Sequence, residues 1–180
     1  MKKIIAIAAL SFVGIAAKAQ VASTATQTVN LNLSNAIELT FTGSTTATGA
    51  AVNLAFNTVN DYANGVQSSA QELKVRSNKK FDVTVKTNNA NFSYTGSTTP
   101  APVMPVSGVL GLKVSANGTG GTIAGTFAGY TSLSGTAANL ISNGLNGGNQ
   151  TFSVMYNATP GFTYPAGTYT VDVVYTATQQ

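Results

Sequence analysis

The sequence predicts an all-β protein, an antiparallel sandwich of two sheets with roughly eight to ten strands. Two observations favour this fold. Apolar residues alternate with polar residues in many short runs, which is the pattern of strands that bury one face. Thr, Val, Asn, Gly, Ala and Ser dominate the composition and only 8% of the residues are charged, which favours strands and turns over helices.

The alternating runs extend along most of the chain, and segments rich in Gly, Asn, Thr and Pro separate them. We interpret each run as one strand whose apolar residues face the core. In chain order these residues are Val29, Leu31 and Leu33; Ile37, Leu39 and Phe41; Val52, Leu54 and Phe56; Leu73 and Val75; Phe81, Val83 and Val85; Leu110, Leu112 and Val114; Phe152, Val154 and Tyr156; and Tyr169, Val171, Val173, Tyr175 and Ala177. Helix is expected only in short turns, at 60–64, closed by Gly65, and at 136–142.

The segments 71–76 and 81–86 predict a β-hairpin with its turn at 77–80. Pairing Val75 with either Phe81 or Val83 keeps one face of this hairpin apolar. A slip of one residue would turn every side chain to the other face. Both of these registers remain open.

The last run, 169–177, follows the turn at Pro165-Ala166-Gly167 and is long and rich in large residues. A long edge strand without charges invites aggregation, and only Asp172 would protect this one. We therefore predict that this strand is central in its sheet and pairs on both sides.

The N-terminus predicts a secretory signal peptide over residues 1–19. Met1 to Lys3 form a basic head, residues 4–17 are apolar, and Ala17-Lys18-Ala19 supplies the small residues that precede cleavage. The alternative is a short core helix. Residues 20–180 then form one domain, exported by a bacterium to the periplasm, the cell surface or the medium. The apolar run is too short to cross a membrane, and no later run reaches about 18 apolar residues, so we expect no membrane span.

The charge balance gives no support for a nucleic-acid partner. The chain has nine Lys and Arg against five Asp and Glu, but Lys2, Lys3 and Lys18 leave with the predicted signal peptide. The remaining excess of one positive charge is too small to attract a polyanion in general.

The side-chain inventory argues against an enzyme. The chain has no His and no Cys, which excludes Ser-His-Asp and Cys-His catalysis and His/Cys zinc sites. The five carboxylates are scattered along the sequence, and Ser77-Asn78-Lys79-Lys80 matches S-x-x-K only between two strand patterns. We expect no catalytic residue, no cofactor and no metal.

One cluster of basic residues is a candidate site for a weak anionic ligand such as a wall polymer. The alternative is an ordinary solvated strand face, because Glu72 and Asp82 lie within the cluster. Its members are Lys74, Arg76, Lys79, Lys80 and Lys86.

Both ends of the chain resemble a known family. Residues 25–43 read ATQTVNLNLSNAIELTFTG and residues 165–178 read PAGTYTVDVVYTAT. Together they resemble pilin-like bacterial surface domains of the spore-coat-U and fimbrial-subunit type, which begin with an alternating strand that runs into an L-x-F-G-like segment and end in G-x-Y-x-v-x-v-x-y. The ending also resembles wall-binding WxL domains, although this chain has no Trp, and the cysteines frequent in fimbrial subunits are absent.

The resemblance implies an immunoglobulin-like sandwich and a secreted structural or adhesive role at the cell surface. Such subunits polymerise by lending a terminal strand to a neighbouring copy, so the partner would be the protein itself. The uncharged stretch 20–33 fits this role, with Val29, Leu31 and Leu33 as the strand-exchange residues. Alternatively, it is the first strand of its own sheet.

A second function stays open, a glycan- or cell-wall-binding module. Carbohydrate sites often use aromatic platforms, and most of the aromatic residues of this chain fall in phase with core positions. The exposed aromatic candidates are Tyr62, Tyr94, Tyr130 and Tyr164.

Overall fold

The computed structural model describes residues 22–44 and 46–180, so the predicted signal peptide at 1–19 lies outside the described residues. The chain divides into two units, residues 1–33 and residues 34–180. In the first unit, residues 22–33 form no helix or strand, and we call them the N-terminal extension. Val29, Leu31 and Leu33 are 75%, 82% and 90% exposed. The strand predicted over these residues is therefore not formed within this chain.

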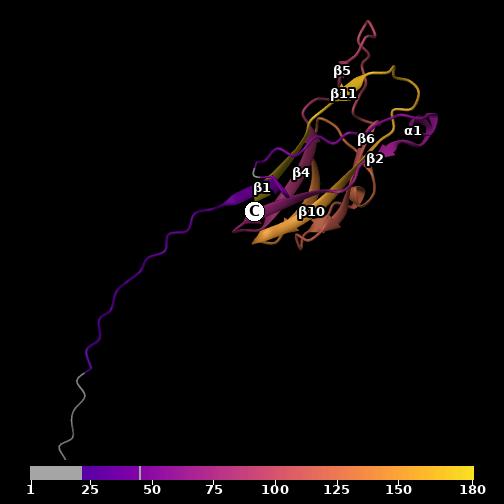
Figure 1. Cartoon of the computed structure of the whole chain (residues 1–180). Coiled ribbons are helices and arrows are strands. Elements are labelled where there is room, and N and C mark those ends of the chain that lie inside the picture. Colours follow the sequence, from indigo (N-terminus) through magenta and orange to yellow (C-terminus); the bar gives the residue numbers. More distant parts are fainter. Residues whose placement is uncertain (1–21, 45) are drawn as a thin grey trace, which may run out of the picture. The chain divides into compact units, whose positions relative to one another are not determined.

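The second unit, residues 34–180, is built from antiparallel sheets that pack against each other, which confirms the all-β sandwich (Figure 1). One sheet contains, in spatial order, β1 (Ile37–Phe41), β3 (Gln71–Ser77), β10 (Gly147–Ala158), β6 (Leu110–Asn117) and β8 (Thr131–Ser132), and β2 (Val66–Gln67) also pairs with β10. The other contains β12 (Val173–Gln179), β4 (Phe81–Thr87), β9 (Ala138–Gly144) and β7 (Thr122–Ile123).

A small ribbon of two strands, β5 (Ser93–Thr95) and β11 (Thr168–Thr170), lies at the end of the domain remote from the C-terminus (Figure 1). Two short helices complete the unit, α1 (Val59–Asn64) and the 3₁₀ helix η1 (Gly125–Ala128). Neither of these helices, which are the only ones in residues 22–44 and 46–180, is long and apolar enough to cross a membrane.

The core lies between the two large sheets and is formed by the residues whose alternation predicted it. Strand β3 buries Leu73 and Val75 and turns Glu72 and Arg76 outward. Every second side chain of a pleated strand points to the same face, so a sequence with this period buries one whole face. The largest fully buried residues are Phe81, Phe127, Phe152, Leu73, Leu112, Leu140 and Ile141.

The predicted hairpin of 71–76 with 81–86 is wrong, because these two strands do not pair with each other. The prediction of which side chains of each strand are buried is confirmed. Strand β3 pairs with β1 and β10, whereas β4 pairs with β9 and β12, so the turn between them carries the chain from one sheet to the other. Buried Ser77 shapes this turn, because its hydroxyl donates to the Lys79 carbonyl at 2.7 Å. Two strands that face each other across a core show the same alternation as two strands of a hairpin.

The last run of the sequence also differs from the prediction. It divides into β11 and β12, and β12 stands at the end of its sheet with β4 as its one hydrogen-bonded neighbour in the described residues. The prediction of a central strand is therefore wrong. The large inward-facing residues of β12 are explained by packing in the core. The Tyr175 ring reaches between the sheets to Phe41 and Phe152, with ring centroids 6.2 and 6.4 Å away.

Short helices were predicted at two places, and one of them forms. Helix α1 was predicted over 60–64 and covers 59–64. It starts with a capping box between Thr58 and Asp61 and ends at Gly65, whose φ of +79° suits glycine. The backbone N–H groups of Thr58 and Asn57 bind the Asp61 carboxylate and lower its pKa.

The second predicted helix, over 136–142, is replaced by strand β9. This strand buries the adjacent residues Leu140 and Ile141, and its pairing with β4 shifts register at this point. Such a bulge breaks the alternation of period two that would have revealed the strand. The run 52–56 forms no strand either, although Leu54 and Phe56 pack against the core.

Candidate functional site

The feature that stands out in this fold is an open sheet edge. The edge strands β7 and β8 have two residues each, whereas β12 has seven and β1 has five. Beyond β4, no strand in the described part of the chain pairs with β12. The backbone groups of β12 that point away from β4 therefore make no strand pairing in the described residues, which is the condition for strand addition.

The β12 edge lacks the charged residues and prolines that usually protect sheet edges against strand addition. Residues 173–179 contain no charged residue and no Pro. Val174, Thr176 and Thr178 point outward, while Val173, Tyr175 and Ala177 pack against the core. An uncharged edge strand of this length is a template for another chain, and natural edges usually avoid this with Lys, Pro or a bulge.

Tyr175 fixes the inner face of this edge. Its hydroxyl lies 2.7 Å from the hydroxyl of Tyr156 on β10, so the pair joins the two sheets across the core. Burial raises the pKa of Tyr175, and the neighbouring Tyr156 raises it further. Burial raises the pKa of Tyr156 as well. Both phenols are therefore neutral at physiological pH, and their hydrogen bond holds β12 against β10.

Hydrogen bonds hold both ends of β12. At the start, Asn88 donates from its side chain to the Asp172 carboxylate at 2.8 Å, and the Asp172 N–H donates to Asn88 Oδ1 at 3.1 Å. At the end, Gln179 donates from Nε2 to the Ala36 carbonyl at 2.8 Å. The contacts at Ala36 and at the Phe41 ring place β12 beside β1 on the same side of the sandwich, with opposite strand directions.

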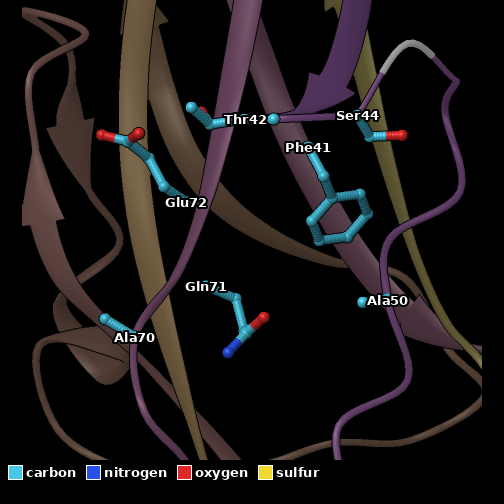
Figure 2. Close-up of a pocket in the computed structure, with 8 residues that line it drawn as sticks. Phe41, Thr42, Ser44, Ala50, Ala70, Gln71 and Glu72 are labelled. Carbon is cyan, nitrogen blue, oxygen red and sulfur yellow. The ribbon is translucent and has the colours of Figure 1, made fainter.

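A hollow of ≈380 Å³ lies where β1 ends (Figure 2). In Figure 2 the Phe41 ring lies between the strand that carries it and the chain at Ala50. A Cβ at Gly49 would come within 2.9 Å of this ring, so only glycine permits this close approach. Glu72 is the one ionisable residue among the described residues that line the hollow.

The structure does not bring the five predicted basic residues to one face. Lys74 and Arg76 lie on the outer face of β3, and Lys79 and Lys80 lie in the turn between the sheets. Lys86 lies on β4 in the other sheet, opposite Val174 of β12. Arg76 also pairs with Glu38 of β1 at 3.2 Å. The five are close in sequence only because the chain crosses between the sheets there.

Aromatic side chains gather at the β5–β11 end of the domain. Tyr62 of α1 stacks on Phe162, with ring centroids 5.6 Å apart and an interplanar angle of 24°. Tyr94 and Tyr169 face each other across the small ribbon at 5.0 Å. Phe56 and Tyr164 adjoin this group. We call these six residues the aromatic cluster.

Three of the four tyrosines that were predicted to be exposed belong to this cluster, and all four are half-buried in the structure. The fourth, Tyr130, lies apart from it, with its hydroxyl on Gln67 and the Lys113 ammonium 4.6 Å from its ring centre. Sequence reasoning missed Phe162, which is 67% exposed, and assigned Tyr169 to the core. A single aromatic residue inside a loop rich in Gly, Thr and Pro carries no periodic signal that could have revealed it.

In residues 22–44 and 46–180, no group of three or more His, Cys, Asp and Glu side chains is placed to hold a metal ion. Comparison with family models gives no match, and comparison with curated proteins gives none either. The resemblance of the two chain ends to pilin-like surface domains therefore stays a prediction.

Proposed function

We propose that this protein is an exported, non-enzymatic structural or adhesive subunit of the bacterial envelope or surface, and that it assembles by strand addition. The N-terminal extension of one copy pairs with the open β12 edge of the next. The observation that carries this proposal is an uncharged edge of seven residues in a chain that also has an exposed, alternating, uncharged segment. Strand addition joins two such features through backbone hydrogen bonds and alternate side chains.

The two segments match in length and in pattern. An antiparallel pairing of residues 27–33 with residues 173–179 places Leu31 opposite Tyr175. Leu33 then lies opposite Val173, and Val29 lies opposite Ala177. Directly opposite residues share a face, so all three apolar residues of the extension point to the core side of the edge. A slip of one residue would place Thr28, Asn30 and Asn32 there instead, which defines the register.

The gain from this pairing is of the same order as the cost of joining two copies. Val29, Leu31 and Leu33 are almost fully exposed, and burying an aliphatic side chain of this size contributes about 1.5–3 kcal/mol. Two costs oppose assembly. Immobilising a neighbouring copy costs roughly 4–15 kcal/mol in lost translation and rotation, and ordering the extension adds to this. The three side chains and the backbone hydrogen bonds of seven residues together are of comparable size.

Matched variants of the extension test this proposal. Leu31→Asp places a carboxylate on the face that would be buried, whereas Asn30→Asp places the same group on the solvent face. Both residues are exposed and unpaired in the described structure, so neither change should alter the melting of the single domain. Analytical ultracentrifugation and negative-stain microscopy should show assemblies for the parent protein and for Asn30→Asp, and monomers for Leu31→Asp.

A result in which the two variants assemble equally would contradict the register. A parent protein that stays monomeric over the whole concentration range would contradict strand addition itself.

A specific observation favours a second function, the glycan- or wall-binding module. One face of the exposed Phe162 ring packs on Tyr62, so the other face is available to the C–H face of a sugar ring. Sedimentation with insoluble cell-wall material tests this function. Phe162→Ala should reduce the bound fraction, and Val103→Ala, at an apolar residue of similar exposure outside the cluster, should leave it unchanged. Equal binding by both variants would contradict the aromatic platform.

A further inference from the structure

We propose that Asn78 and Gln179 form a clasp that directs the N-terminal extension to a neighbouring copy and keeps it from its own β12 edge. This inference rests on the strand addition proposed above and adds a positioning role for two residues outside the paired segments. Hydrogen bonds surround Ser34 and Ala36, which lie between the extension and β1.

Asn78 extends the pairing of β1 with β3 beyond the last paired residues, Ile37 and Ser77. Its backbone N–H donates to the Ala36 carbonyl at 3.2 Å. Its side-chain amide then takes the place of a further backbone unit, because Oδ1 accepts from the Ala36 N–H at 3.0 Å and Nδ2 donates to the Ser34 carbonyl at 2.8 Å. These three bonds hold residues 34–36 in line with β1.

Gln179 adds the connection to the edge strand. Its Nε2 lies 2.8 Å from the Ala36 carbonyl oxygen, 3.0 Å from Ser77 Oγ and 2.9 Å from Asn78 Oδ1. The C-terminal end of β12 is therefore tied to the start of β1. We call Asn78, Gln179 and the bonded backbone of residues 34–36 the clasp.

The position of the clasp decides which edges the extension can reach. Ala36 lies at the C-terminal end of β12, so an extension folded back along its own β12 would run parallel to that strand. Folding back requires the chain to reverse at residues 34–36, which breaks the bonds to Asn78. Parallel neighbours pair less well per residue and normally need a long connection. A second copy has neither restriction and can offer its extension antiparallel.

A disulfide between engineered cysteines distinguishes the two arrangements, because the chain has no cysteine of its own. In the antiparallel register proposed above, Asn30 of one copy lies opposite Thr176 of the next. A chain that reverses at residues 34–36 runs back along β12 from the C-terminal end of that strand, which brings Asn30 close to the same position on β12. Asn30→Cys combined with Thr176→Cys therefore reports both arrangements after oxidation, as linked copies or as a linked single chain.

With the clasp intact, oxidation should give a ladder of linked copies on a non-reducing gel. With Asn78→Ala, the share of monomers that carry the disulfide within the chain should rise by about fivefold or more, the factor expected for each hydrogen bond lost. Asn78→Asp keeps the acceptor for the Ala36 N–H and should give an intermediate share. Asn88→Ala is the matched control, since it removes hydrogen bonds at the other end of β12 and should leave the share unchanged.

An unchanged share in Asn78→Ala, with the ladder still present, would overturn the clasp and leave strand addition standing. An equal rise in Asn88→Ala would also overturn it, because general loosening of β12 would then explain the effect. Absence of any disulfide with the clasp intact and broken would overturn strand addition and the clasp together.

Discussion

The hydroxyl groups of Tyr156 and Tyr175 lie 2.7 Å apart in the core and join β10 of one sheet to the edge strand β12 of the other. Removing one of them leaves its partner buried without a hydrogen bond. Tyr175→Phe should therefore lower the free energy of unfolding by about 1–3 kcal/mol. Urea unfolding followed by circular dichroism measures this change.

The same pair allows a sharper control. The double variant Tyr156→Phe, Tyr175→Phe removes both hydroxyls and leaves no orphan group, so it should lose less stability than the sum of the two single variants. Additive losses would mean that the two hydroxyls do not act as partners.

Stability should fall at alkaline pH because of these two tyrosines. Their folded-state pKa values are raised above the ordinary value of 10.0, mainly by burial. Below pH of about 10 both states are neutral and the contribution is fully present. Above it the unfolded chain releases protons that the folded chain keeps, so stability falls with rising pH by up to about 1.4 kcal/mol per unit for each group. The slope of unfolding free energy against pH should be smaller in the double Phe variant, and an equal slope in both proteins would contradict this origin.

A charge introduced on the buried face of β4 should lower stability much more than a charge on its outer face. Val83 is fully buried, whereas Thr84 lies on the outer face opposite Thr176. Val83→Asp should destabilise the domain by several kcal/mol, of the order of 3 or more, because an unpaired carboxylate would be buried. Thr84→Asp should change the melting temperature little. Thermal unfolding of both variants checks the faces, and similar losses would contradict them.

Gly144 should tolerate no side chain. A Cβ at this position of β9 would lie 2.6 Å from the Phe81 ring, which is itself completely buried. Gly144→Ala should therefore cost about 1–3 kcal/mol through overpacking. Gly148→Ala is the matched control, since nothing lies within 4 Å of its Cβ position. A loss of stability in the control as large as in Gly144→Ala would show that backbone freedom, and not the Phe81 contact, explains the effect.

The alternation of apolar residues predicted the buried faces of most strands but not their neighbours. Leu73 and Phe81 face the same core from two different sheets, and the sequence around them looks the same as in a hairpin. Tyr175 was expected in a central strand because its face is large and apolar. Its ring fills the space between the sheets, and this burial requires no second neighbour for its backbone.

The candidate site could be predicted only in part. The apolar residues Val29, Leu31 and Leu33 were recognisable as strand-forming, and their alternation suits donation to another copy. The open edge was not predictable, because backbone pairing leaves no mark on the side chains of β12. The predicted basic residues do not share one face for the same reason that the hairpin does not form. Lys74 and Lys86 lie on strands of different sheets.

Amide hydrogen exchange, measured by mass spectrometry in dilute and in assembled protein, tests the central proposal of strand addition at the β12 edge most directly. In dilute monomer the extension should exchange freely, and the amides of β12 that point away from β4 should exchange faster than those bonded to it. On assembly, residues 27–33 and 173–179 should become protected together, while the β8 edge should not change. Assembly that leaves 173–179 unprotected, or that protects β12 without the extension, would contradict the account.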